Sequence, residues 1–167
     1  MTFQIRLAEP AEYAAIGALT VEAYQSDELL HADSEYVAEL ADAASRARDA
    51  ELWVAVDEHA LLGTVTHCPA GSPYRELAGD GEGEFRMLAV SPTHRRQGAA
   101  RALVEHCITR SIAAGDRQVV ICSLRQMRGA HRLYEGIGFV RCAERDWQPV
   151  PAVELLAFAL DLRPVSR

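Results

Sequence analysis

The succession of strand-type and helix-type segments along the chain limits the folds that it can adopt. The segment 3–8 alternates apolar and polar residues like a half-buried strand, and 9–24 follows with apolar residues at helical spacing. A second amphipathic helix is predicted over 33–48, with Asp33 or Ser34 as its N-cap and a loop before it over 25–33. The chain therefore begins with a strand and two helices.

A hairpin, a third strand and two strand–helix pairs follow. Two β-rich runs within 51–68 are joined by the polar residues 57–59, which predicts an antiparallel pair. A glycine-rich loop over 69–83 precedes the strand 84–90, and the clearest helix runs from Gly98 to a predicted cap at Gly115. The remaining patterns predict a strand at 118–124, a helix at 127–139 and strands at 139–147 and 153–162. The predicted order is β-α-α-β-β-β-α-β-α-β-β.

Length and composition narrow the protein class. The chain has 167 residues, 49% of them apolar, which suits a single domain over 1–167. Lys and Arg number 17 against 24 Asp and Glu, for a net charge of -7, so a nucleic-acid partner is not expected. The sequence shows neither a long apolar run nor a signal-peptide layout, which predicts a cytoplasmic protein without a membrane partner. Widely spaced cysteines and unclustered histidines predict no metal site.

A local concentration of positive charge interrupts this acidic chain at residues 94–106, HRRQGAARALVEH. A short turn before a helix leaves the first N–H groups unpaired at the positive end of the helix dipole. Gly98 lets a phosphate approach the backbone, and Arg95 and Arg96 add charge. The stretch predicts an anion site, the alternative being a solvated basic helix start. Neither a Walker loop nor a Rossmann glycine pattern is present.

Two motifs together resemble the GNAT superfamily of acetyl-CoA-dependent N-acetyltransferases. Residues 95–100, RRQGAA, match the R/Q-x-x-G-x-G/A signature of that family after a strand-type segment, EFRMLAVSP. Residues 130–139, AHRLYEGIGF, resemble the family segment A-x-x-L-Y-x-x-x-G-F. The resemblance implies an α+β fold of the three-layer type, with a mixed, mostly antiparallel central sheet flanked by helices and splayed between its fourth and fifth strands.

The resemblance also implies how the cofactor, acetyl-CoA, would be bound. The backbone amides of Gln97, Gly98, Ala99 and Ala100 would hold the pyrophosphate, with Arg95 and Arg96 beside it. The main chain of Leu88, Ala89 and Val90 would pair with the pantetheine arm, because the ligand amides satisfy an unpaired strand edge. Many family members carry asparagine where this chain has Met127, so Met127 either packs against the pantetheine or belongs to the core.

The reaction that the resemblance implies needs a base and a proton donor. An alkylamine has a pKa of about 10.4 and must lose a proton before it attacks the thioester. Glu84 occupies the place of the glutamate base of the family, the alternative being a solvent-facing carboxylate at the strand end. Tyr134 matches the family tyrosine that donates to the thiolate, the alternative being a core aromatic on an apolar helix stripe.

The predicted substrate is a small-molecule or peptide amine. Seven carboxylates in the two variable loops would attract a cationic amine, the alternative being acidic loops that only keep the protein soluble: Asp27, Glu28, Asp33, Glu76, Asp80, Glu82 and Glu84. A competing interpretation is a catalytically silent GNAT-fold module that binds an acyl-CoA as a sensor or interaction subunit. The sequence leaves the oligomeric state open, including a homodimer.

Overall fold

A central sheet of eight strands carries the fold in the computed structural model, which describes residues 2–27, 29 and 35–163. The strand order is β1-β2-β3-β4-β5-β8-β6, and β7 also pairs with β8. The strands are β1 (Gln4–Leu7), β2 (Glu51–Val56), β3 (Leu61–Cys68), β4 (Glu82–Val90), β5 (Gln118–Leu124), β6 (Val140–Arg141), β7 (Trp147–Val150) and β8 (Val153–Asp161). Every pair is antiparallel except β4 and β5, which confirms the predicted mixed, mostly antiparallel sheet.

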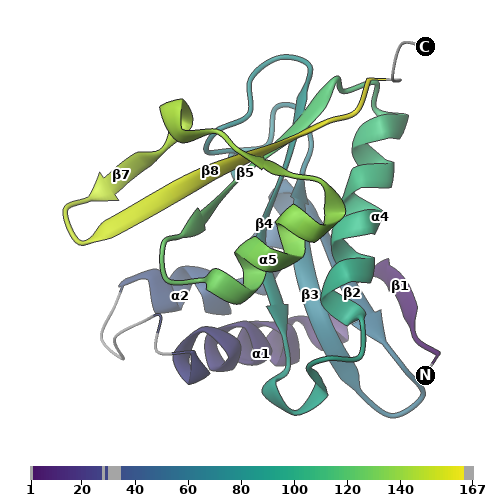
Figure 1. Ribbon diagram of the computed structural model, residues 1–167. Coiled ribbons are helices and arrows are strands. Elements are labelled where there is room, and N and C mark those ends of the chain that lie inside the picture. Colours follow the sequence, from purple (N-terminus) through teal and green to yellow (C-terminus); the bar gives the residue numbers. More distant parts are fainter. Residues whose placement is uncertain (1, 28, 30–34, 164–167) are drawn as a thin grey trace.

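Helices cover both faces of this sheet (Figure 1). The helices are α1 (Tyr13–Ser26), α2 (Glu35–Ala41), α3 (Ala43–Asp49), α4 (Ala99–Ala113) and α5 (Arg128–Ile137). Ile16 of α1 and Ala43 of α3 pack against Leu52 and Val54 of β2. The opposite face buries α4 and α5 in a larger core cluster with Phe85 of β4. Within the described residues, no helix has the length and apolar character that a membrane span requires.

The predicted helix over 33–48 is wrong in one respect, because the structure divides it at Asp42. Asp42 has non-helical backbone angles, and its Oδ1 accepts a hydrogen bond of 3.1 Å from the backbone N–H of Ser45. An aspartate that caps a new helix competes with continuation of the previous one. The predicted N-cap at Asp33 or Ser34 lies outside the described residues. The predicted loop from 25 begins too early, since α1 continues to Ser26.

The segment 139–147 also differs from the single strand predicted for it. Two residues form β6, a 3-10 turn follows over Ala143–Arg145, and β7 begins at Trp147. Both short strands pair with the same long partner, β8. The turn between them brings Arg145 to the start of β4, where its guanidinium forms ion pairs with Glu82.

The sheet is splayed between β4 and β5, as predicted. These two parallel strands pair only at Glu82 with Gln118 and at Gly83 with Val119, although β4 continues to Val90 and β5 to Leu124. Beyond Gly83, the edge of β4 that faces β5 has no strand partner within the described residues. Figure 1 shows β5 and β8 turning away from β4. An opening lined by unpaired backbone groups therefore lies in the middle of the sheet.

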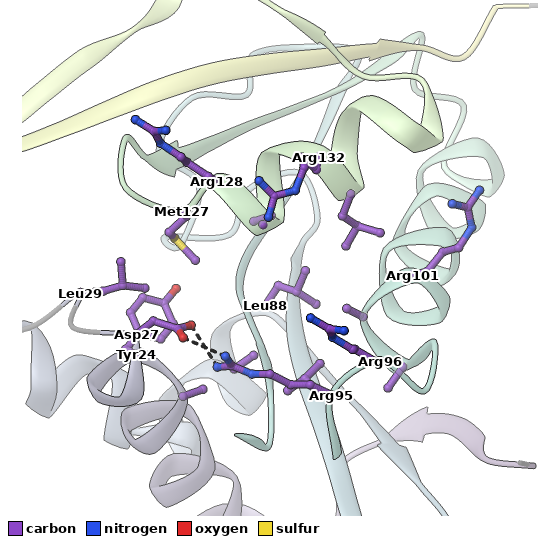
Figure 2. Close-up of a pocket in the computed structure, with 18 of the residues that line it drawn as sticks. Tyr24, Asp27, Leu29, Leu88, Arg95, Arg96, Arg101, Met127, Arg128 and Arg132 are labelled. Atoms are coloured by element: carbon purple, nitrogen blue, oxygen red, sulfur yellow. Dashed lines mark hydrogen bonds and ion pairs between the residues drawn. The ribbon is translucent and has the colours of Figure 1, made fainter. Parts of the chain in front are cut away.

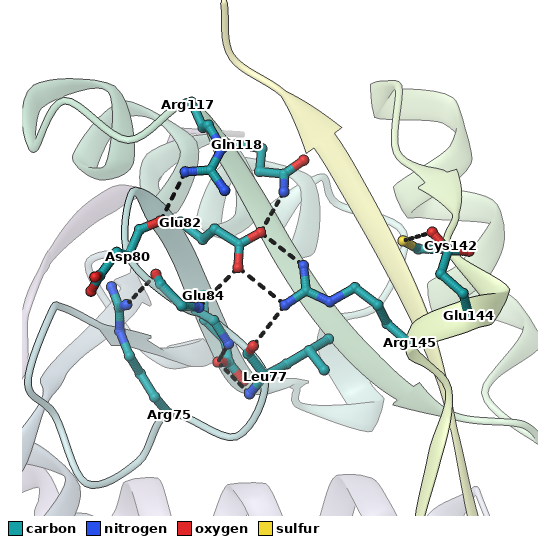
Figure 3. Close-up of polar contacts among 12 residues, drawn as sticks. Arg75, Leu77, Asp80, Glu82, Glu84, Arg117, Gln118, Cys142, Glu144 and Arg145 are labelled. Atoms are coloured by element: carbon teal, nitrogen blue, oxygen red, sulfur yellow. Dashed lines mark hydrogen bonds and ion pairs between the residues drawn. The ribbon is translucent and has the colours of Figure 1, made fainter.

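A polar cluster around Glu82 holds the closed end of this opening (Figure 3). The Glu82 carboxylate accepts two hydrogen bonds from Arg145, at 2.8 and 3.0 Å, and one from Gln118 of β5. Arg145 also donates to the carbonyl of Leu77 at 2.8 Å. These hydrogen bonds, led by those from Arg145, lower the pKa of Glu82 from 4.5 to about 2. Glu82 thus joins β4, β5 and the turn after β6.

We expect Glu82→Gln to lower the free energy of unfolding by on the order of 2 kcal/mol at pH 7, because the charged pair with Arg145 is lost. The Glu82 carboxylate binds a proton less readily in the folded protein than in the unfolded chain. Its contribution to the free energy of unfolding is therefore complete above about pH 4.5 and disappears as the pH falls toward 2. Denaturant titration across this range measures the effect. Glu58→Gln, the same change on an exposed turn, serves as the control. Equal losses of stability in the two variants would contradict the assignment.

Candidate active site

The start of α4 has the geometry of an anion site. Gly98 is its N-cap residue, with a left-handed φ of 87°, and no side chain caps the first turn. The first backbone hydrogen bond of the helix runs from the Ala102 N–H to the Gly98 carbonyl at 3.0 Å, so the preceding N–H groups have no carbonyl within the helix. A Cβ at Gly98 would meet nothing within 4 Å. The space beside Gly98 is therefore free, and the uncapped amides lie at the positive end of the helix dipole.

A cavity of about 740 Å³ lies at this helix start, between the end of α1, the open half of β4 and the start of α5. It brings together most of the residues predicted to bind the cofactor: Leu88, Ala89, Val90, Arg95, Arg96, Gly98, Ala99, Ala100 and Met127. Gln97 does not line it, and its side-chain Oε1 is buried without a hydrogen-bond partner among the described residues. The cavity is within the size range of sites for small molecules and cofactors.

Five arginines line the cavity: Arg95, Arg96, Arg101, Arg128 and Arg132. Figure 2 shows Arg132 of α5 and Arg96 of the loop before α4 on different sides of it. Arg95 forms a bidentate pair with Asp27 at the end of α1, at 2.8 and 3.0 Å, and Arg101 pairs with Glu105. The other three form no ion pair within the part of the chain that the structure describes. The cavity therefore offers several cations to an anionic ligand.

A bulge in β4 shapes the strand edge beside this cavity. The register of β3 with β4 shifts between Thr64 and Thr66, which leaves one extra residue in β4, and Met87 has a positive φ of 56°. Met87 packs with Tyr24 of α1, whereas Leu88 returns to the side of the α4 and α5 core. A bulge bends its strand and increases the local twist. This one lies within the stretch where β4 has separated from β5.

Tyr134 lies on α5 within the aromatic core and is not among the residues that line the cavity. Its ring contacts Phe85, Phe139 and Phe158 at centroid distances of 5.7 to 6.0 Å, and the residue is 5% exposed. Its hydroxyl makes no hydrogen bond within the described residues, although a buried tyrosine hydroxyl usually finds a partner. Burial raises the pKa of Tyr134 above its usual range. The hydroxyl therefore keeps its proton at neutral pH and can donate a hydrogen bond.

Glu84 is fully buried and does not line the cavity. Its carboxylate accepts hydrogen bonds of 2.9 to 3.2 Å from the backbone N–H groups of Glu76, Leu77 and Ala78. Figure 3 shows Glu84 against the loop at Leu77. Side chains alternate along β4, so Glu84 faces away from the side on which Phe85 meets Tyr134. In this position Glu84 anchors the loop, and its role as general base stays a prediction.

The acidic residues predicted to surround the cleft are largely paired inside the protein. Asp27 pairs with Arg95, Glu76 with Arg86 and Glu82 with Arg145, whereas Glu84 binds backbone amides. Glu28 and Asp33 lie outside the described residues. These internal pairs reduce the negative charge that the loops could present to a substrate. Attraction of a cationic amine by an acidic rim therefore stays a prediction.

Three arginines of the cavity, Arg101, Arg128 and Arg132, were not among the residues predicted to bind the cofactor. Arg128 and Arg132 lie on α5, four residues apart, which places them on the same side of the helix. That spacing was readable in the helix predicted at 127–139, but a pair of arginines on an amphipathic helix is usually a solvated face. Only the packing of α5 beside the start of α4 brings them to the cavity.

Comparison with known proteins gives a family for this arrangement. Residues 48–141 match the family model described as an acetyltransferase (GNAT) domain. The chain is 32% identical to rat (Rattus norvegicus) N-acetyltransferase 8F1 over 93 residues, which are 56% of this chain and 41% of that protein. It is 33% identical to rat N-acetyltransferase 8B over 97 residues, 58% of this chain and 42% of that protein. The chain thus spans less than half the length of these curated relatives.

Solved structures agree in fold. A GNAT-family acetyltransferase from Staphylococcus aureus Mu50 superposes with a TM-score of 0.77 at 11% identity, over 97% of this chain and all of that one. The protein yncA from Salmonella typhimurium, whose structure contains its cofactor acetyl-CoA, superposes with a TM-score of 0.69 at 20% identity, over 100% and 98% of the two chains. With a family model matching more than half of its length and this fold around its cavity, the chain belongs to the GNAT family of acetyltransferases.

Proposed function

We propose that this protein transfers an acetyl group from acetyl-CoA to a primary amine, with both substrates bound at the same time. The observation that carries the proposal is the cavity at the start of α4, where uncapped helix amides and several arginines face open space. Phosphate groups bind at such helix starts because the amides and the dipole both favour negative charge. The solved structure of yncA contains acetyl-CoA in the same fold.

The residues around the cavity fit the chemical parts of acetyl-CoA. The amides around Gly98, with Arg96 and the two arginines of α5, would hold phosphate groups. The unpaired edge of β4 at Leu88–Val90 would hydrogen-bond the amides of the pantetheine arm as a neighbouring strand would. Met127 lines the cavity and fits beside that arm, with its Sδ already accepting a hydrogen bond from Ser123.

Bound acetyl-CoA would supply an acetyl thioester with a thiolate as leaving group. The chain would hold this thioester in the opening between β4 and β5 while the amine approaches it. In this proposal the Tyr134 hydroxyl donates a hydrogen bond to the sulfur that leaves, since burial keeps its proton in place. Holding both reactants in register supplies much of the rate enhancement, so a covalent enzyme intermediate is unnecessary.

A binding module without catalysis is the second candidate. The observation that favours it is the position of Glu84, whose carboxylate is occupied by the loop instead of facing the cavity. A thiol-release assay with acetyl-CoA and a panel of primary amines, from polyamines to peptides with free amino groups, separates the candidates. We expect thiol release that depends on both substrates. Thermal stabilisation by CoA without turnover of any amine would support the binding module instead.

Gly98→Asp should abolish CoA binding, because it places a carboxylate among the helix amides at a backbone conformation that favours glycine. Gly115→Asp is a matched control: Gly115 ends the same helix, has a φ of 83° and also faces open space, but does not line the cavity. Isothermal titration with CoA measures the dissociation constants. Equal loss of binding in both variants would show that backbone strain, and not loss of the phosphate-binding amides, is responsible.

Arg96→Ala should weaken CoA binding only partly, since other cations remain at the cavity.

Tyr134→Phe should lower kcat by about 10²-fold and leave the dissociation constant for acetyl-CoA nearly unchanged. The ring keeps its contacts with Phe85, Phe139 and Phe158, so only the hydroxyl is removed. Steady-state kinetics with the best amine of the panel provide the measurement. Tyr13→Phe, the same change on α1 at the opposite face of the sheet, is the control. Unchanged turnover in Tyr134→Phe would remove the tyrosine from the mechanism.

A further inference from the structure

The carboxylate of Glu76 connects the two strands that border the opening. Glu76 belongs to the loop before β4, and its Oε1 lies 2.7 Å from Nε of Arg86 on β4. The same oxygen lies 3.9 Å from Sγ of Cys122 on β5. Both neighbours follow the point at which β4 and β5 stop pairing. Glu76 does not line the cavity at the start of α4, but it bridges β4 and β5 beyond their last paired residues, where no backbone ladder joins the strands.

Glu84 fixes the loop that carries Glu76. Its carboxylate binds the N–H of Glu76 itself and those of the next two residues. These bonds hold the backbone directly at the base of the Glu76 side chain. A carboxylate buried from solvent and bound by several amides is suited to shaping a loop, and this loop delivers a second carboxylate to the opening.

Glu76 differs from Glu84 in its access to solvent and in its electrostatic surroundings. Its side chain is 24% exposed, whereas Glu84 is fully buried. Burial raises the pKa of Glu76, Arg86 opposes this effect, and the negative charges of Glu84 and Glu39 add to it. Three further titratable groups interact electrostatically with this carboxylate, each from a different element: Tyr36 of α2, Cys68 of β3 and Cys122 of β5. A carboxylate with a raised pKa is a better proton acceptor near neutral pH.

We propose that Glu76 accepts the proton from the acceptor amine and that Glu84 is the positioning residue that holds Glu76 in place. The inference rests on the proposed acetyl transfer. As the amine nitrogen forms its bond to the acetyl carbon, the C–S bond breaks and its electron pair stays on sulfur. The proton leaves nitrogen for the Glu76 carboxylate and passes from its exposed side to water. Arg86 and the Glu84-bound loop keep the carboxylate at the opening.

The pH dependence of kcat/KM tests this assignment in the wild type, Glu76→Gln and Glu84→Gln. Protonation of the base gives the wild type a decline on the acid side. In Glu76→Gln we expect kcat/KM to fall by about 10²-fold and that decline to disappear, while the titration of the amine near its own pKa remains. Glu84→Gln should lower kcat but retain the decline. Glu76→Asp should recover part of the rate together with the decline, and Glu58→Gln should match the wild type.

The outcomes distinguish this inference from the proposed function. Two outcomes would overturn the assignment and leave acetyl transfer intact. In the first, Glu76→Gln turns over with the pH profile of the wild type. In the second, only Glu84→Gln loses the acid-side decline. Absence of wild-type turnover with every amine would overturn both. Titration with acetyl-CoA reports whether Glu76→Gln is folded, because Glu76 does not line the cavity at the start of α4 and the variant should bind acetyl-CoA as the wild type does. If Glu84→Gln does not fold, Glu76→Gln and Glu76→Asp decide the question.

Discussion

The short contact between β4 and β5 sets the geometry of the site. Two residue pairs join these parallel strands, and the Glu82 carboxylate links both to Arg145 beyond β6. With the strands held at one end only, the sheet twist and the bulge at Met87 separate them along the remainder of β4. The opening leaves strand groups unpaired in the interior of the protein. A ligand that pairs with them can therefore bind between strands without disrupting an existing ladder.

Charge is distributed unevenly around this opening. The chain carries a net charge of -7, yet five arginines line the cavity at the start of α4. Asp27 neutralises Arg95 and also connects the end of α1 to the loop before α4. The remaining charge lies close to helix amides that no side chain caps. An anionic ligand is therefore attracted locally, while the acidic remainder of the protein disfavours nonspecific contact with polyanions.

Three glutamates close together in the sequence have different environments for reasons that only packing explains. Glu82 pairs with Arg145, Glu84 binds the amides of a loop, and Glu76 reaches the opening beside Arg86. Alternation along β4 places Glu82 and Glu84 on the same side of the strand, but a distant arginine reaches only Glu82. Residue type and local sequence position did not distinguish these three carboxylates. The partners that did so come from other parts of the chain.

Local sequence patterns were enough to predict the order of the main elements, the hairpin at 57–59, the helix between Gly98 and Gly115, and a candidate anion site at its start. These features depend on local patterns, because periodicity, turn residues and glycine conformation act over a few neighbouring residues. The tertiary structure decided the break at Asp42, the division of 139–147, the bulge at Met87 and the arrival of Arg128 and Arg132 at the cavity. It also placed the Glu76 carboxylate between Arg86 and Cys122. Apart from the break at Asp42, whose partner Ser45 is only three residues away, these features depend on contacts between segments far apart in the chain, whose partners no local pattern reveals.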